Sequence, residues 1–474
     1  MSNADIGMIG LAVMGANLIR NIERNKYSCV VYNRTSAVTE KFMQEQQGKN
    51  FIAADSLQSL VSALKRPRKI LVMVKAGDPV DAVIESLIPL LDQGDIICDL
   101  GNSHYLDTIR REKYCKDKGL LFIGVGVSGG EEGALNGPSI MPGGDKSAWS
   151  ELSEVFDAIS AKVPEPCHVY IGPNGAGHFV KTVHNGIEYG DMQLIAESYD
   201  LLRKVKNLKP DQLHSVFQDW NQGVLSSFLV EITAEIFLQK DDQAEGYLVD
   251  HILDKAKQKG TGKWTAESAL ELGIPIPVIA AAVTARGLSM LKNERKIAST
   301  ILSSEKVQET LIPDGDFISA VHDALYCSKI VSYAQGLALL SAASAEYDWD
   351  LKLDQIAAIW RGGCIIRAKF LAEIMRAYKD NPKLSNLLLD PVIQTEIENR
   401  LPAWRRVVAQ ASLFGIPILG FSSALSYYDS YRTANLPQNL TQAQRDFFGA
   451  HTFERTDKEG SFHAEWGQIN TSTK

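Results

Sequence analysis

The chain has 474 residues, of which 45% are hydrophobic and 22% are charged. These values are typical of a globular protein with two or three domains. A formal net charge of -8 argues against general nucleic-acid binding, which favours a basic surface. The sequence contains no run of about 18 uninterrupted apolar residues and begins with no basic segment, so neither a membrane span nor a signal peptide is expected. The predicted location is the cytoplasm.

Short apolar runs alternate with helical patterns over residues 1–176. Continuous runs rich in β-branched residues between helices are typical of a parallel sheet that is buried on both faces. The sequence therefore predicts a doubly wound, Rossmann-type α/β domain. Its strands are expected at residues 6–9, 29–32, 70–74, 95–99, 121–125 and 168–171.

Apolar residues recur at helical spacing from residue 177 to residue 434, for example over 317–347 and 351–366, and strand signals are scarce. This pattern predicts a large all-α domain. Residues 435–474 form a separate tail that is rich in aromatic residues but too short for a core of its own. Two interpretations stay open, a frayed terminus or an ordered tail that lies on a second subunit.

The six cysteines form no C-x-x-C pair, and several lie inside apolar runs. This spacing favours buried thiols over a disulfide or zinc framework. The cysteines are Cys29, Cys98, Cys115, Cys167, Cys327 and Cys364.

A G-x-A-x-x-G form of the dinucleotide-binding fingerprint follows the first predicted strand and opens a helix. Its residues are Gly10, Leu11, Ala12, Val13, Met14 and Gly15. The glycines allow a tight turn and close helix–strand packing, and the small middle residue lets backbone N–H groups approach a pyrophosphate. The motif alone also fits an ordinary strand–helix turn, but its place inside a βαβ unit favours a cofactor site.

The residues after the second predicted strand are Asn33, Arg34 and Thr35. An NAD site usually has an acidic residue here for the ribose 2′-hydroxyl, whereas Arg34 suits a 2′-phosphate. We therefore expect NADP as the cofactor. The alternative is that Arg34 is an ordinary surface charge.

Two further strand ends are expected to line the same crevice, because ligands bind at the carboxyl ends of the strands in this fold. Val74, Lys75 and Ala76 lie at the end of the third predicted strand, and Asn102 follows the fourth. Asn102 is a candidate for contact with cofactor, substrate or both, although asparagine is also common in turns.

A long helix is predicted from Gly177 through Leu201, with four polar residues at i, i+3, i+4 and i+7. These are Lys181, His184, Asn185 and Glu188, and at about 100° per residue they form one stripe. The apolar flank consists of Phe179, Val180, Val183, Ile187 and Met192. The stripe is either a solvated face or the lining of a cleft in which Lys181 and Glu188 perform acid–base chemistry.

Two glycine-containing loops and one isolated arginine are candidates for substrate binding. Ser128, Gly129 and Gly130 follow the fifth predicted strand, where small residues permit close approach of a ligand. Lys259 and Thr261 lie in a basic loop that suits a phosphate. Arg286 lies in an apolar helical run, so we expect an anionic ligand or a structural salt bridge. The cationic tail residues are Arg445 and His451.

With these residues the chain resembles the 6-phosphogluconate dehydrogenase family over essentially all 474 residues. The resemblance rests on residues 10–15, 33–35, 73–77, 126–133, 141–144, 177–192, 259–264 and 444–451. It is most specific in the segment from Lys181 to Glu188 and in the 259–264 loop. One departure is Leu100, where the family usually has a glycine and where a side chain is expected to crowd the turn holding Asn102.

The resemblance implies an NADP-dependent oxidative decarboxylation of 6-phospho-D-gluconate to D-ribulose 5-phosphate, CO2 and NADPH. It also implies a cytoplasmic homodimer without a metal, acting in the pentose phosphate pathway and gluconate utilisation. Related β-hydroxyacid dehydrogenases and non-catalytic NADP-binding proteins are the alternatives.

By the same resemblance, Lys181 is the general base and Glu188 the general acid. The residues implied for the sugar acid are Asn102, Ser128, Gly129, Gly130, His184 and Asn185. Those implied for the phosphate are Tyr189, Lys259, Thr261 and Arg286. Arg445 and His451 are expected to reach in from the partner subunit.

Overall fold

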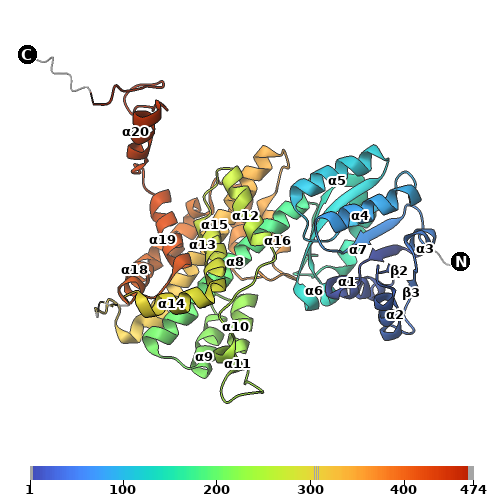
Figure 1. Ribbon diagram of the computed structural model, residues 1–474, viewed down its shortest axis with the longest axis horizontal. Helices are drawn as coiled ribbons and strands as arrows, with labels where there is room; N and C mark the ends of the chain where they lie inside the picture. Colours follow the sequence, from blue (N-terminus) through green and yellow to red (C-terminus); the bar gives the residue numbers. More distant parts are fainter. Residues whose placement is uncertain (1–3, 304, 306, 308, 468–474) are drawn as a thin grey trace, which may run out of the picture. The chain divides into compact units, whose positions relative to one another are not determined.

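The computed structural model describes residues 4–303, 305, 307 and 309–467. It divides into two compact units, Met1–Ala424 and Leu425–Lys474. Within the described residues, the first unit contains a seven-stranded sheet followed by a large set of helices (Figure 1). This order confirms the predicted fold class, a Rossmann-type α/β domain followed by an all-α domain. The predicted domain boundaries after residues 176 and 434 stay predictions.

The strands lie in the order β3-β2-β1-β4-β5-β6-β7. Their bounds are β1 Ile6–Ile9, β2 Cys29–Tyr32, β3 Phe51–Ala53, β4 Lys69–Val72, β5 Ile96–Asp99, β6 Leu121–Ser128 and β7 Ser139–Gly144. Neighbouring strands from β3 to β6 are parallel, whereas β7 pairs antiparallel with β6. The strand order reverses at β1, which lies between β2 and β4, so a ligand crevice is expected at the carboxyl end of β1.

One predicted strand is absent from the described residues, and two strands of the sheet were not predicted. Residues 168–171 form no strand and make only isolated bridges, such as the one between His168 and Ile140 of β7. The missed strands are β3, which has only three residues, and β7, which contains Pro142 and two glycines. Proline is tolerated in β7 because this strand lies at the edge of the sheet.

Helices cover both faces of the sheet because alternate strand residues point to opposite sides. Leu71 belongs to a core cluster that includes residues of α1 and α7, whereas Ile70 and Val72 belong to a second cluster with residues of α3, α4 and α5. The helices of this region are α1 Val13–Arg24, α2 Ser36–Glu45, α3 Leu57–Ser62, α4 Asp78–Leu87, α5 Tyr105–Asp117, α6 Gly130–Asn136 and α7 Lys146–Ile159, with a 3-10 turn, η1, at Ile88–Leu90. All six cysteines are free and buried, as predicted.

Helix α8, Ala176–Lys206, links the sheet to the helical region (Figure 1). It contacts β6 and β7 on one side and α12, α13 and α15 on the other. Four of its five predicted apolar flank residues are fully buried, but Met192 is 43% exposed. The prediction was wrong for Met192 because this side chain lies at the surface beside Arg286, whose Nη2 is 3.4 Å from the sulfur.

The remaining helices of the first unit confirm the predicted helical content. They are α9 Pro210–Trp220, α10 Phe228–Leu238, α11 Leu248–His251, α12 Thr261–Glu271, α13 Pro277–Met290, α14 Lys292–Ile301, α15 Phe317–Glu346, α16 Leu353–Ile359, α17 Leu371–Asp380 and α18 Pro391–Leu413, with 3-10 turns at Asp314–Asp316 and Leu387–Leu389. Helix α16 ends well before the predicted residue 366. The reason is a glycine pair in which Gly363 has a φ of 63°, a conformation that does not continue a right-handed helix. None of the described helices is long and apolar enough to cross a membrane.

The second unit contains α20, Gln438–Gly449, and the end of α19, Leu419–Tyr431. Phe453 and Phe462 form an antiparallel bridge in the tail. The Asp446 carboxylate accepts hydrogen bonds from the backbone of Thr452 and Ala464 and from the side chains of His463 and Trp466. Burial alone would raise the pKa of Asp446, but these bonds lower it to about 2. The tail is thus ordered around one buried carboxylate instead of an apolar core.

Candidate active site

The dinucleotide fingerprint is built on two close backbone contacts. Gly10 has a φ of 101°, and a Cβ atom there would lie 2.3 Å from the Met73 carbonyl oxygen. A Cβ at Gly15 would lie 2.1 Å from the Gly10 carbonyl oxygen. Both positions therefore require glycine, because a Cβ atom at either would clash with a carbonyl oxygen. Gly10 also requires glycine for its positive φ. This is the packing predicted for the turn between β1 and α1.

The N-terminus of α1 is suited to an anion. Ala12 at the N-cap offers no side-chain hydrogen bond, and the first turn contains no acidic residue. Ala12 and Val13 are exposed, so the helix N-terminus is open to a ligand. Leu11 instead packs into the core, and its N–H donates to Asn33 Oδ1 at 3.2 Å. A pyrophosphate fits this N-terminus, because the helix dipole and free N–H groups favour negative charge.

The other predicted cofactor residues lie at the ends of strands β2, β4 and β5. Arg34, Thr35, Lys75 and Asn102 are exposed, and Val74 and Ala76 are partly buried. Strands β2 and β4 flank β1, β5 lies next to β4, and all four are parallel, so these side chains share the carboxyl edge of the sheet.

Leu100 does not crowd this edge, contrary to expectation. Its side chain is 3% exposed and belongs to the apolar core. Its φ is not positive, so the position does not require glycine. The turn that holds Asn102 therefore accommodates leucine by turning this side chain into the core.

The polar stripe of α8 lines an interior site and is not a solvated face. Lys181 is 6% exposed and His184 is fully buried. Lys181 Nζ donates to Asn185 Oδ1 at 2.8 Å, and His184 Nδ1 lies 3.0 Å from the same oxygen. Beyond α8, His184 Nε2 lies 3.4 Å from Ser128 Oγ at the end of β6, and Asn185 Nδ2 donates to Thr261 Oγ1 at 3.2 Å. One hydrogen-bonded group thus joins β6, α8 and α12.

Glycines in the loop after β6 bring the chain close to this group. A Cβ at Gly126 would lie 2.3 Å from Lys181 Cβ, so only glycine allows this approach of β6 to α8. Gly129 and Gly130, which follow Ser128, have φ values of 122° and 62°. This left-handed backbone leads from the strand into α6 and leaves the loop without bulky side chains.

Burial shifts the pKa values of the two predicted catalytic groups toward each other. It lowers the pKa of Lys181, although the Glu188 carboxylate partly opposes this shift. It raises the pKa of Glu188, against the charges of Lys181 and Arg286. Burial and the Lys181 charge hold the pKa of His184 well below its usual range. Burial thus shifts the amine toward its neutral form and the carboxyl group toward its protonated form, and it favours a neutral imidazole.

Four residues were predicted to bind the phosphate of the substrate. Two of them, Arg286 and Tyr189, contact each other, and the other two, Lys259 and Thr261, are close in the sequence. The Arg286 guanidinium lies 3.4 Å from the centroid of the Tyr189 ring. Among the described residues it has no carboxylate partner, so the structural salt bridge, one of the two alternatives for Arg286, is not formed. Thr261 is buried at the start of α12, whereas Lys259 is exposed. Arg286 is thus a half-buried cation whose charge is available to an anionic ligand.

The two predicted tail residues lie in the second unit. Arg445 is exposed on α20 and donates to Gln442 Oε1 at 3.1 Å. His451 is also exposed, and its ring centroid lies 5.9 Å from that of Phe448. Phe447 and Phe448 are 66% and 73% exposed. The tail therefore presents cationic and apolar side chains together.

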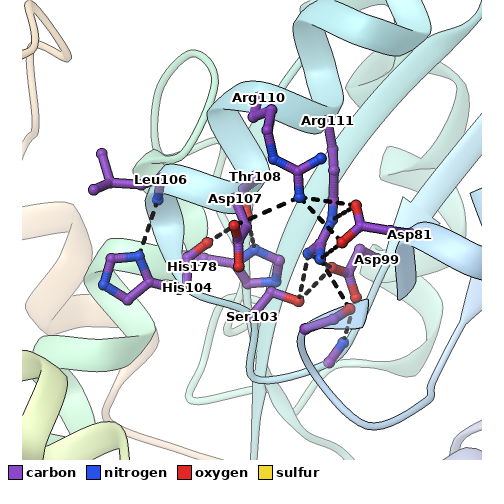
Figure 2. Close-up of polar contacts among 12 residues, drawn as sticks. Asp81, Asp99, Ser103, His104, Leu106, Asp107, Thr108, Arg110, Arg111 and His178 are labelled. Carbon is purple, nitrogen blue, oxygen red and sulfur yellow. Dashed lines mark hydrogen bonds and ion pairs between the residues drawn. The ribbon is translucent and has the colours of Figure 1, made fainter. Parts of the chain in front are cut away.

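Sequence reasoning missed the buried polar cluster beside Asn102, which is centred on Arg111 of α5 (Figure 2). Arg111 is 1% exposed, whereas its neighbour Arg110 lies at the surface. Two consecutive arginines in a charged helix give no signal that one of them is buried. Within the described part of the chain, no group of three or more acidic, histidine or cysteine residues could hold a metal ion.

Comparison with known proteins gives the same assignment for both parts of the chain. Residues 5–172 match the NAD binding domain of 6-phosphogluconate dehydrogenase, and residues 177–466 match its C-terminal domain. The chain belongs to the 6-phosphogluconate dehydrogenase family.

Curated relatives match along nearly the whole chain. A Bacillus subtilis protein named 6-phosphogluconate dehydrogenase, NADP(+)-dependent, decarboxylating, is 58% identical over 467 residues, which cover 98% of this chain and 100% of the relative. A Synechococcus elongatus 6-phosphogluconate dehydrogenase, decarboxylating, is also 58% identical, over 470 residues with the same coverage.

A solved structure agrees in fold over the same length. Plasmodium falciparum 6-phosphogluconate dehydrogenase has a TM-score of 0.94 and 47% identity, covering 98% of this chain and 100% of that one. That enzyme was described in its apo form, with its cofactor NADP+ and with its substrate 6-phosphogluconate.

The electrostatic link between Lys181 and Glu188 can be tested directly. Glu188→Gln removes the negative charge that raises the pKa of Lys181, so this pKa should fall further below the ordinary lysine value. Competitive labelling with a small acylating reagent, followed by mass spectrometry, measures the reactivity of Lys181 against pH. The titration midpoint should move to lower pH in the variant. Glu294→Gln removes an exposed carboxylate on α14 and should not move it; an unmoved or raised midpoint in Glu188→Gln would contradict the link.

Proposed function

We propose that this protein catalyses the NADP-dependent oxidative decarboxylation of 6-phospho-D-gluconate to D-ribulose 5-phosphate, CO2 and NADPH. The observation that carries the proposal is the pair of opposite pKa shifts on one face of α8. A buried lysine with a lowered pKa and a carboxyl group with a raised pKa form a base and an acid in the same site. The relatives named above carry the same activity in their names.

The residues around α1 suit a dinucleotide. Gly10 and Gly15 leave room at the turn, the exposed N-terminus of α1 suits the pyrophosphate, and Arg34 suits the 2′-phosphate. Val74, Lys75, Ala76 and Asn102 extend this site along the neighbouring strand ends. NADP, when bound, supplies the acceptor for the hydride that leaves C3 of the sugar acid.

Lys181 takes the proton of the C3 hydroxyl group as the hydride leaves C3. Its neutral form is favoured by burial, and its Nζ is oriented by the bond to Asn185. Oxidation gives a 3-keto acid, in which protonated Lys181 polarises the new carbonyl group. The bond between C1 and C2 then breaks, CO2 leaves, and its electron pair forms an enol.

Glu188 completes the reaction by donating a proton to the former C2 of the sugar acid, which becomes C1 of the ketose product. Its raised pKa shifts the group toward the protonated form that this step requires. The reaction belongs to the pentose phosphate pathway and to gluconate utilisation, and the proposed location is the cytoplasm.

Two sets of residues hold the substrate. We assign the sugar acid to Asn102, Ser128, Gly129, Gly130, His184 and Asn185. We assign its phosphate to Tyr189, Lys259, Thr261 and Arg286. Support comes from Arg286, which has no carboxylate partner among the described residues, and from the uncapped N-terminus of α12, which begins at Thr261.

The active enzyme is a homodimer in which Arg445 and His451 complete the partner's site. Exposed Phe447 and Phe448 on the same short helix support this assignment, because large apolar side chains at the surface are typical of an interface. The order that Asp446 imposes on the tail also supports it, since a frayed terminus would not hold these residues in place.

The proposed reaction is tested by NADPH absorbance with 6-phosphogluconate and, in parallel, with 3-hydroxyisobutyrate. Turnover of 6-phosphogluconate alone is expected. Lys181→Met should lower kcat by about 100-fold or more, the usual contribution of a general base, with little change in substrate Kd. Glu188→Gln should slow the protonation step, detected by deuterium incorporation at C1 of ribulose 5-phosphate in D2O. Preference for 3-hydroxyisobutyrate, or near-normal turnover by either variant, would refute the corresponding assignment.

Cofactor selection by Arg34 gives a separate prediction. Arg34→Asp removes charged hydrogen bonds to the 2′-phosphate and places a like charge beside it. The ratio of kcat/KM for NADP to that for NAD should fall by roughly 10- to 100-fold, as the loss of about 1.5–3 kcal/mol implies. Lys49→Asp changes the charge of an exposed residue without a predicted cofactor role and serves as the control. An unchanged ratio in Arg34→Asp would show that another residue selects the cofactor.

The shared site is tested by mixing two impaired variants, Arg445→Ala and Lys181→Met. Each heterodimer then contains one site with both lesions and one site with neither. Re-associated subunits should regain activity that neither parent has, because loss of the Arg445 contact costs about 1.5–3 kcal/mol only where it is missing. A mixture of Lys181→Met with Glu188→Gln cannot restore a site if both residues act within one subunit, so it should stay inactive. If heterodimers of the first pair form without regained activity, the tail serves its own subunit.

A further inference from the structure

Arg111 is a buried arginine whose side chain connects two loops at the ligand edge of the sheet (Figure 2). The first loop follows β4 and contains Lys75 and Ala76. The second follows β5 and contains Asn102. A buried guanidinium group is costly unless its donors are satisfied, so the contacts of Arg111 define what it does.

On the β4 side, Arg111 binds the start of α4. Its Nε and Nη2 donate to the two carboxylate oxygens of Asp81 at 2.9 and 2.8 Å, and Nη2 also donates to the Gly77 carbonyl oxygen at 3.0 Å. The pKa of Asp81 is lowered by these hydrogen bonds. Gly77 has a φ of 90° and forms the N-cap of α4. Arg111 thus fixes the residue at which the loop after β4 becomes a helix.

On the β5 side, Arg111 binds residues on both sides of Asn102. Its Nη1 donates to Ser103 Oγ at 3.3 Å and lies 3.7 Å from Asp99 Oδ2. The fully buried Asp99 carboxylate in turn accepts the Ser103 hydroxyl at 2.5 Å and the Gly101 N–H at 3.0 Å. Asn102 is therefore held between two residues that share one carboxylate, and that carboxylate faces Arg111.

We propose that Arg111 is a positioning residue that holds Asn102 and the loop after β4 in place for the nicotinamide half of NADP. The inference rests on the proposed function, because it requires NADP to lie across the strand ends. Arg34 at β2 takes the 2′-phosphate of the adenosine half. Since β4 and β5 lie on the other side of β1, the nicotinamide half lies over the loops that Arg111 connects.

The planar arginine fork is necessary for this task. It binds one carboxylate with two parallel bonds and still reaches a carbonyl and a hydroxyl group of other loops. Lysine keeps the charge but has a single nitrogen, so it cannot span both loops. Arg110 is a matched control within the same cluster, because it binds Asp81 through Nη2 at 2.9 Å but is exposed and contacts neither Gly77 nor Ser103.

The test compares the affinity of the full-length homodimer for NADP+ with its affinity for adenosine 2′,5′-bisphosphate, which lacks the nicotinamide half. Calorimetry gives both Kd values. In Arg111→Lys, the Kd of NADP+ should rise by about tenfold, as expected for one lost charged hydrogen bond, while the Kd of adenosine 2′,5′-bisphosphate should not change. Ser103→Ala should act in the same direction but less strongly. Arg110→Gln should change neither value.

Three results would overturn the inference: an unchanged Kd of NADP+ in Arg111→Lys, an equal loss for both ligands, or an equal effect of Arg110→Gln. An equal loss of affinity for both ligands would mean that the substitution destabilises the whole cofactor-binding domain. If Arg111→Lys does not fold, Ser103→Ala decides, and equal binding of NADP+ by this variant and the wild type refutes the inference. Failure of the wild-type protein to bind NADP+ would instead refute the proposed function.

Discussion

The close approach of α8 to strands β6 and β7 is the constraint on which the candidate active site depends. Three glycines permit it: a Cβ at Gly126 would meet Lys181, and one at Gly143 or Gly177 would meet the backbone of the other. Because no side chains separate the helix from the sheet, Lys181 is buried. Burial lowers its pKa and makes a neutral amine accessible. Backbone packing thus lowers the pKa of the proposed base.

The same burial has the opposite effect on Glu188, seven residues along α8. Its pKa is raised, because desolvation penalises the charged form of an acid as it does that of a base. A salt bridge between the two groups would stabilise their charged forms and so bring both pKa values back toward their ordinary values. The hydrogen bond of Lys181 goes to the neutral Asn185, and among the described residues Glu188 has no ion-pair partner. The amide therefore orients the lysine without an opposite charge, so the pKa shifts that burial causes in the two groups are not cancelled by an ion pair.

Sequence patterns predicted those features of the structure that depend on residues close together in the chain. The 3.6-residue period and the apolar flank predicted α8 and its stripe, since both depend only on neighbours along the chain. The fingerprint at Gly10 was equally predictable, because its conformation is set by the turn itself. Short strand β3 and edge strand β7 were missed, since their pairing depends on distant residues and β7 contains proline. Arg111 was missed for the same reason: its partners, such as Asp81 and Ser103, come together only in the folded domain.

The charged residues buried in α8 differ in whether they have a partner of opposite charge. Asp191 lies three residues beyond Glu188, is 1% exposed and accepts from Lys329 Nζ at 2.5 Å. Such a pair balances its own charges inside the protein. Lys181 and Glu188 lie in the same helix but have only neutral partners or none among the described residues. Because no ion pair among the described residues fixes their charges, the pKa shifts that burial causes in them persist. The same helix thus contains a buried ion pair at Asp191 and, at Lys181 and Glu188, groups for which the described part of the chain provides none.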